Sequence, residues 1–179
     1  MEKNPEISIV IPLFNENESL KELIETTQSV MDIHKYDYEI IFIDDGSTDK
    51  SWISIKEISK KYKNIFGISF SKNYGKSQAL HAGFEKAKGN FIFTLDADLQ
   101  DSPHEIPLMH KILLNENLDL ISGWKKKRFD SFFFKNMPSK LFNWAARKVS
   151  GIKIHDFNCG IKGYRKNVVK NIYVYGEMH

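Results

Sequence analysis

The chain has 179 residues, of which 41% are hydrophobic and 27% charged, and it contains one cysteine, Cys159. This length suits one packed domain, and the composition excludes a disordered chain and a disulfide-stabilised scaffold. The net charge of +3 is uneven, because residues 123–153 carry nine basic residues and one acidic residue, which leaves −5 on the rest of the chain.

Apolar runs alternate with amphipathic stretches along the first two thirds of the chain. Strands are expected at 7–14, 38–44, 65–70, 91–95 and 118–122, and helices at 18–31, 51–62, 76–87 and 104–115. The strands are almost continuously apolar, which is typical of strands buried on both faces. This alternation predicts an α/β fold with a parallel, helix-covered sheet. Beyond Gly123 we expect a helix over 139–151 and a short strand near 160–165.

Polar residues follow the first two predicted strands, and ligands of open α/β sheets bind beyond the carboxyl ends of the strands. The residues at the first strand end that we expect to meet a base and a ribose are Pro12, Phe14, Asn15 and Glu16. At the second strand end, the carboxylates of Asp44 and Asp45 are expected to accept hydrogen bonds from a base or from ribose hydroxyls. Ordinary turn chemistry is an alternative explanation for both stretches.

The third strand end contains Gly75-Lys76-Ser77, which resembles the close of a phosphate-binding P-loop. The first glycine of that motif would stand at position 70, where this chain has Phe70, so the motif is incomplete. Lys76 is still expected to touch phosphate as a point charge. No G-x-G-x-x-G occurs, and dinucleotide binding is therefore not expected.

The fourth strand end, LDADLQDSPHE, gathers four carboxylates within ten residues. Ser102 to Glu105 reads as a capping box with Pro103 at the first helical position. Asp101 is also suited to the positive end of that helix. We therefore interpret Asp101, Ser102 and Glu105 as structural residues.

Asp96, Asp98 and Gln100 have no such structural explanation. In an extended segment alternate side chains point the same way, so these three are expected to converge while Ala97 and Leu99 face the protein. Two carboxylates and an amide oxygen suit Mg²⁺ or Mn²⁺. This stretch therefore predicts a site for a metal and a diphosphate.

Five motifs in order resemble glycosyltransferase family 2, in its branch of polyisoprenyl-phosphate sugar transferases: PLFNENESL, FIDDGSTDKS, NYGKSQALHAGF, LDADLQDSPHEIP and DFNCGIKGYRK. The resemblance implies a GT-A (Rossmann-like) nucleotide-diphospho-sugar transferase fold and a single catalytic domain over 1–179. It also implies transfer of a sugar from a UDP- or GDP-sugar to a polyisoprenyl phosphate, with inversion, for cell-envelope glycan synthesis. The chain ends inside a motif that normally continues, so we expect a missing membrane-associated part.

The resemblance also implies roles for individual residues. The expected nucleotide-binding residues are Pro12, Phe14, Asn15, Glu16, Asp44, Asp45, Lys76, Asp96 and Ala97. The metal, Mg²⁺ or Mn²⁺, is expected on Asp96, Asp98 and Gln100, and the acceptor phosphate on Arg128, Lys135 and Ser139. The chain departs from the usual family sequence at two positions. Phe14 stands where a tyrosine is usual, and Lys125 stands where an arginine is frequent. The second change replaces a guanidinium, which can bind an anion through two N–H groups, with the point charge of a lysine.

Asp156 is the candidate catalytic residue near the acceptor. A sugar hydroxyl acceptor would require a general base, and Asp156 would supply it. A phosphomonoester acceptor has a second pKa of about 6 and is largely dianionic at neutral pH. For that acceptor we expect Asp156 to position the substrate. A turn carboxylate beside Gly160 is the alternative.

The basic window interleaves Lys125–Arg128 and Lys135 with the aromatic run Phe132–Phe134. This pattern favours contact with an anionic membrane surface. We expect the protein at the cytoplasmic face of the membrane. A core of apolar residues with solubilising lysines is the alternative. Nucleic acid is not expected, because the carboxylate-lined crevice would repel it.

Three other functions stay open from the sequence. They are a family 2 transferase that acts on a sugar hydroxyl, a haloacid-dehalogenase-like phosphatase, and a non-catalytic module that binds nucleotide or membrane. The phosphatase also places Asp-x-Asp after an apolar strand, although its motif usually lies near the start of the chain. The sequence predicts no oligomeric state.

Overall fold

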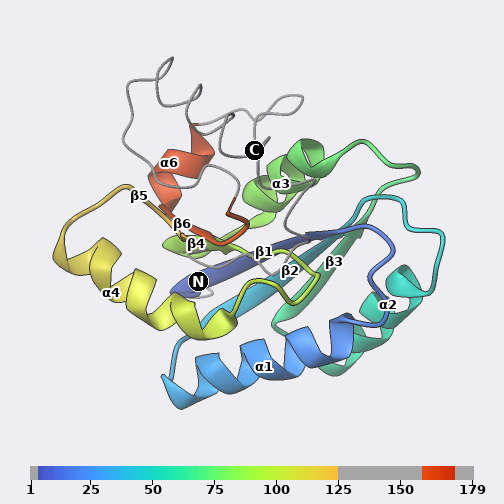
Figure 1. Cartoon of the computed structure of the whole chain (residues 1–179), viewed down its shortest axis with the longest axis horizontal. Coiled ribbons are helices and arrows are strands. Elements are labelled where there is room, and N and C mark those ends of the chain that lie inside the picture. Colours follow the sequence, from blue (N-terminus) through green and yellow to red (C-terminus); the bar gives the residue numbers. More distant parts are fainter. Residues whose placement is uncertain (1–3, 125–158, 172–179) are drawn as a thin grey trace, which may run out of the picture.

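The computed structural model describes residues 4–124 and 159–171, which build one six-stranded sheet (Figure 1). Its strands are β1 (Ile7–Leu13), β2 (Tyr38–Asp44), β3 (Ile65–Ser69), β4 (Phe91–Thr94), β5 (Leu120–Ser122) and β6 (Lys162–Arg165). The strand order is β3-β2-β1-β4-β6-β5. The first four of these run parallel, and β6 runs antiparallel to β4 and to β5. The predicted α/β class with a mostly parallel sheet is confirmed.

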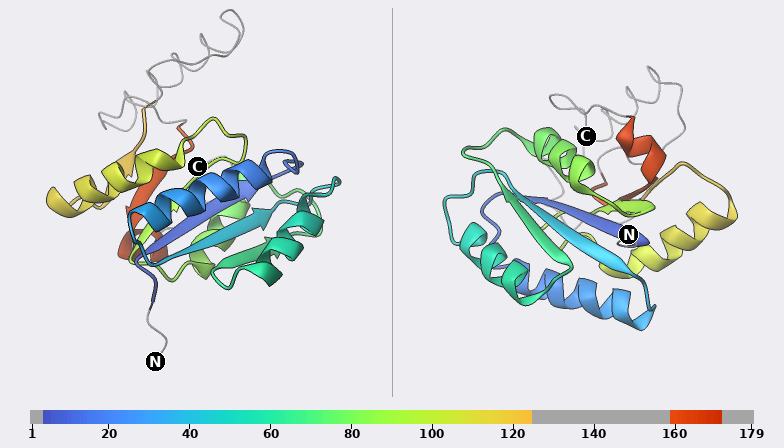
Figure 2. Two further views of the ribbon diagram at one scale, coloured as in Figure 1. Left: turned by 90° about the horizontal axis from the view of Figure 1, so that it is seen from below. Right: turned by 180° about the vertical axis from the view of Figure 1, so that it is seen from behind.

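Helices cover both faces of the sheet. They are α1 (Leu20–Ile33), α2 (Ser51–Lys61), α3 (Lys76–Lys86), α4 (Ile106–Asn115) and α6 (Lys166–Lys170), with a 3₁₀ turn, η1 (Pro103–Glu105), before α4. In Figure 1, α1, α2 and α4 lie along the lower side of the sheet and α3 and α6 along the upper side. Figure 2 shows the same layers from two further directions.

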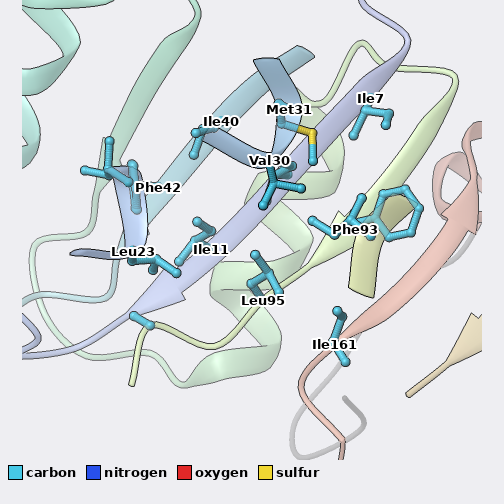
Figure 3. Close-up of a cluster of buried hydrophobic side chains, with 14 of the residues drawn as sticks. Ile7, Ile11, Leu23, Val30, Met31, Ile40, Phe42, Phe93, Leu95 and Ile161 are labelled. Atoms are coloured by element: carbon cyan, nitrogen blue, oxygen red, sulfur yellow. The ribbon is translucent and has the colours of Figure 1, made fainter. Parts of the chain in front are cut away.

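The central strands are apolar throughout because both of their faces are buried. On one face, Ile11, Phe42 and Phe93 pack against the apolar stripe of α1, which includes Leu23 and Met31 (Figure 3). The alternate residues of the same strands point to the other face. There the buried side chains of α3 pack on Val10, Ile41, Ile43 and Ile92. Continuous apolar runs are what a two-sided parallel sheet requires.

Element boundaries agree with the sequence prediction to within two residues, with two differences. The helix expected over 104–115 begins as the 3₁₀ turn η1, and α6 was not predicted. The helix expected over 139–151 lies outside the described residues. Among the helices that the structure describes, none combines the length and apolar character needed to cross a bilayer.

Candidate active site

A pocket of about 400 Å³ opens where the carboxyl ends of β1 and β4 meet. The connection after β1 leads to β2, toward one edge of the sheet, and the connection after β4 leads to β5 at the other edge. In open α/β folds, ligands bind at such a point. The volume is typical of small-molecule sites. The pocket is lined by Pro12, Leu13, Phe14, Glu16, Asp45, Asn73, Gly75, Lys76, Ala79, Asp96, Ala97 and Asp98.

Two carboxylates and a lysine meet in this pocket. Asp96 follows β4, and its Oδ1 accepts a hydrogen bond from Lys76 Nζ at 2.6 Å. Asp98 is exposed, and its Oδ1 accepts the backbone N–H of Gln100 at 3.0 Å. Asp98 therefore starts a tight turn while its side chain lines the pocket.

The extended geometry predicted for 96–100 is wrong. Ala97 is buried as expected, but Leu99 has a φ of 61° and its side chain is 39% exposed. The chain turns at this point, so the alternation of side chains stops. Asp96 and Asp98 still share the pocket, whereas Gln100 is not among its lining residues.

The predicted capping box is also wrong. Ser102 precedes η1, but its side chain makes no capping hydrogen bond, and the Glu105 N–H donates to the backbone carbonyl of Ser102 instead. Asp101 is 3% exposed and its Oδ2 lies 3.4 Å from the Asp96 backbone N–H, which it accepts. Asp101 thus supports the backbone of Asp96.

Gly160 packs directly against the carboxylates of Asp96 and Asp101. Its carbonyl accepts a hydrogen bond from Thr94 Oγ1 at 2.7 Å, which fixes the chain leading into β6 on the end of β4. A Cβ at this position would lie 2.3 Å from Oδ2 of Asp96 and 2.3 Å from Oδ2 of Asp101. Only glycine fits this close approach without moving the two carboxylates.

The neighbouring carboxylates Asp44 and Asp45 have different environments. Asp44 is buried, accepts from the Ser47 N–H and from Ser69 Oγ, and does not line the pocket. Asp45 lines the pocket, and its two oxygens accept the backbone N–H groups of Tyr74 and Gly75 at 2.7 and 2.9 Å. Asp45 therefore holds the loop that presents Lys76.

Asn15 connects two of the loops around the pocket and does not itself line it. It has a φ of 57°, and its N–H donates to Ser47 Oγ at 2.8 Å. Its Oδ1 accepts the N–H groups of Thr48 and Asp49 at 2.8 and 3.3 Å. This clasp fixes the stretch that presents Phe14, which is 43% exposed at the pocket.

Sequence reasoning missed four lining residues, Leu13, Asn73, Gly75 and Ala79. The glycine just before α3 was a usable signal, because it has a φ of 93° and precedes the helix that carries Lys76. The four acceptor-side residues that were predicted, Arg128, Lys135, Ser139 and Asp156, lie outside the described residues.

The residues of the pocket fit a divalent cation that is shared with a substrate. Across residues 4–124 and 159–171, no group of three or more His, Cys, Asp or Glu side chains is placed to hold a metal ion. Mg²⁺ commonly needs only one or two carboxylates, because it keeps waters and takes phosphate oxygens as ligands. Asp96 and Asp98 provide that number.

The chain is similar to known proteins over most of its length. Residues 8–173 match the family model described as glycosyl transferase family 2. The dodecaprenyl-phosphate galacturonate synthase of Rhizobium johnstonii is 35% identical over 97% of this chain and 52% of that protein. The undecaprenyl-phosphate 4-deoxy-4-formamido-L-arabinose transferase of Pseudomonas fluorescens is 38% identical over 91% of this chain and 48% of that protein. The chain spans about half the length of these curated relatives.

Solved structures show the same fold. A mannosyltransferase from Pyrobaculum calidifontis, in complex with GDP-Man and Mn²⁺, superposes with a TM-score of 0.70 at 16% identity and covers 97% of this chain and 48% of its own. Glucosyl-3-phosphoglycerate synthase from Mycobacterium tuberculosis, in complex with UDP, gives 0.69 at 21% identity over 92% and 58%. The fold is the GT-A fold. The chain belongs to glycosyl transferase family 2.

Proposed function

We propose that this chain is the catalytic part of a glycosyltransferase that moves a sugar from a UDP- or GDP-sugar to a polyisoprenyl phosphate, with inversion. The observation that carries the proposal is the pocket at the end of β1 and β4, where Asp96, Asp98 and Lys76 converge. The names of the two curated relatives, which specify polyprenyl-phosphate acceptors, support the acceptor class. The proposed role is cell-envelope glycan synthesis.

In this proposal the nucleoside lies between the ends of β1 and β2. Phe14 and Pro12 supply apolar contact to the base, and Glu16 and Asp45 accept hydrogen bonds from the base or ribose. Phe14 offers a ring without a hydroxyl, so it contributes stacking alone. Asn15 and Asp44 act indirectly, because their side chains hold the loops in place.

The diphosphate lies over the end of β4. Asp96 and Asp98 would hold Mg²⁺ or Mn²⁺, and Ala97 lines the pocket between them. Gln100 acts through its backbone N–H, which fixes the carboxylate of Asp98. The metal, when bound, acts as a Lewis acid that neutralises charge on the leaving diphosphate. Lys76 adds a second positive charge next to Asp96.

The proposed binding site for the acceptor phosphate is inferred from the sequence and the family resemblance alone. A phosphate nucleophile is dianionic near neutral pH, because its second pKa is about 6, so we assign Asp156 a positioning role. Arg128, Lys135 and Ser139 bind the acceptor phosphate at the cytoplasmic face of the membrane. In the active protein, Asp156→Asn should reduce transfer less than Asp98→Ala. An equal loss that depends on pH would instead make Asp156 a general base.

A transfer assay tests the proposed function. The full chain is incubated with labelled UDP- or GDP-sugars, undecaprenyl or dolichyl phosphate and Mn²⁺, and label is counted in the organic phase. Transfer should fall by about a hundredfold or more in Asp98→Asn, since charge stabilisation in such sites is typically worth that much. Glu105→Gln is the matched control, because this nearby carboxylate is exposed and does not line the pocket.

The other outcomes separate the alternatives. Transfer to a sugar hydroxyl in place of the lipid phosphate would keep the family and change the acceptor. Nucleotide-sugar binding without turnover would make the chain a binding module. Release of phosphate from a simple phosphomonoester would support the phosphatase, which the family match does not favour.

A further inference from the structure

Lys76 forms an unusual ion pair across the pocket. It is the first residue of α3, in the connection after β3, whereas Asp96 follows β4. Those two strands are separated in the sheet by β2 and β1. The Nζ–Oδ1 distance is 2.6 Å and the side chains are 34% and 26% exposed. By contrast, Lys21 and Glu25 on α1 are 4.0 Å apart and 86% and 67% exposed.

The backbones on both sides of this pair are fixed. Asp45 holds the N–H groups of Tyr74 and Gly75, immediately before Lys76. Asp96 is held by its backbone N–H on Asp101 and by the close approach of Gly160. The part of the pair that can move is the four-carbon lysine stem, which carries a compact charge.

Charge balance in the pocket explains what the lysine does. Four carboxylates line it, from Glu16, Asp45, Asp96 and Asp98, and Lys76 is the one basic side chain among the described lining residues. A diphosphate that enters such a pocket adds negative charge to it. Cations must therefore bind together with the diphosphate to balance this charge. A divalent ion bound to Asp96 would lie next to the Lys76 ammonium, because both cations would contact the same carboxylate.

We propose that Lys76 is an internal counter-cation that shares Asp96 with the divalent metal and moves to the diphosphate when metal and nucleotide bind together. The inference rests on the proposed function and deepens it. Lys76 weakens binding of the metal alone, because two cations on one carboxylate repel each other. It strengthens binding of the metal–nucleotide complex, because the phosphate oxygens then offer Lys76 a new partner. Metal and nucleotide binding are thereby coupled.

Coupling of this kind is reciprocal and measurable without turnover. The affinity of the full chain for Mn²⁺ is measured from the electron paramagnetic resonance signal of the free ion, without nucleotide and with saturating UDP or GDP. The ratio of the two Mn²⁺ dissociation constants gives the coupling factor. The proteins compared are the wild type, Lys76→Met, Lys76→Arg, Lys72→Met and Asp98→Ala.

Lys76→Met should bind Mn²⁺ alone several-fold more tightly than the wild type, and its coupling factor should fall by about fivefold or more, the lower end of typical allosteric couplings. Lys76→Arg keeps the charge and should behave like the wild type in the absence of nucleotide. Lys72→Met removes the same charge from an exposed lysine that lies over the Tyr74 ring and outside the pocket, and should change neither value.

Two results would overturn the inference. One is a folded Lys76→Met protein whose affinity for Mn²⁺ alone is unchanged or weaker, which would make the pair purely structural. The other is an unchanged coupling factor. Failure of the proposed function looks different, because the wild type would then bind no Mn²⁺ in the presence of either nucleotide and Asp98→Ala would have no effect.

Discussion

Single residues set the geometry of the carboxylates at the end of β4, and Gly160 is the most constrained of them. Gly160→Ala would place a methyl group 2.3 Å from oxygens of Asp96 and Asp101. We expect a loss of about 1–3 kcal/mol in the free energy of unfolding, as is typical of overpacking, together with weaker metal–nucleotide binding. Urea unfolding and Mn²⁺ titration measure the two effects.

Ser102→Ala is the control for this substitution. Ser102 is exposed in the same region and its side chain makes no capping bond, so the stability change should stay within about 0.5 kcal/mol. A loss of about 1 kcal/mol would indicate that it caps the helix after all. Wild-type stability in Gly160→Ala would contradict the close approach of Gly160 to the two carboxylates.

His110 on α4 gives the fold a pH dependence that is separate from the site. The ring packs edge-on against Tyr36 and Phe91, and its Nε2 lies 3.5 Å from Glu6 Oε1. Burial lowers the pKa of His110, and the Glu6 carboxylate offsets part of this shift. The folded state therefore takes up a proton less readily than the unfolded state, whose histidine titrates near pH ~6.5.

The sign of the effect follows from this difference in proton uptake. Stability is complete above the unfolded pKa and is lost as the pH falls from there through the lowered folded pKa. Denaturant unfolding at pH 7.5 and 5.5 should show this loss, and His110→Gln should lose less over the same interval. Equal losses in the two proteins would mean that other groups carry the pH dependence.

At the scale of elements, the clasp around Asn15 joins the loop after β1 to the loop after β2. Asn15→Ala removes the bonds from Thr48 and Asp49 and places alanine at a φ of 57°. Asn15→Gly removes the same bonds but tolerates that φ. Asn15→Gly should cost about 1–2 kcal/mol for the lost hydrogen bonds, and Asn15→Ala about 1 kcal/mol more for the backbone.

Nucleotide affinity should fall in both Asn15 variants, because the stretch that presents Phe14 loses its support. Thermal unfolding and nucleotide titration check the two halves of this prediction. If both variants bound nucleotide with wild-type affinity, the clasp would have no part in shaping the pocket.

The sequence predicted the elements well because their signals are local. Continuous apolar runs and the polar residues that end them located β1, β2 and β4 to within one residue. Five of the six pocket-lining polar side chains were found for the same reason, since they follow strands or open a helix; Asn73 was the exception. The turn at Leu99 and the missing cap at Ser102 depend on contacts that no local pattern encodes.

Long-range pairings account for the rest. The antiparallel β6 lies between β4 and β5, and the bond from Thr94 Oγ1 to Gly160 crosses 66 positions of the chain. Asp45 received a nucleotide role from its place after β2, but its bonds to Tyr74 and Gly75 reach 29 and 30 residues away. Such contacts appear only once the strands are assembled.

For the whole molecule, the charge asymmetry predicts where the chain meets a membrane. Replacing Lys125, Lys126 and Lys127 with Glu should weaken binding to anionic vesicles and reduce its salt dependence, because each basic residue near such a surface contributes about 1 kcal/mol. Lys56, Lys60 and Lys61 of α2 are the matched control, because replacing them with Glu makes the same change of charge in another part of the chain. Vesicle co-sedimentation measures both. If the two triple variants bound vesicles equally well, the membrane would not bind preferentially at Lys125–Lys127.

The central claim is that the pocket at the ends of β1 and β4 binds a nucleoside diphosphate with a divalent metal. Calorimetric titration of UDP and of GDP, each with Mn²⁺ and with chelator, tests it most directly on wild type, Asp98→Ala and Glu105→Gln. We predict metal-dependent binding of one nucleotide by the wild type and Glu105→Gln, and its loss in Asp98→Ala. Binding that persists in chelator, or that survives in Asp98→Ala, would contradict the claim.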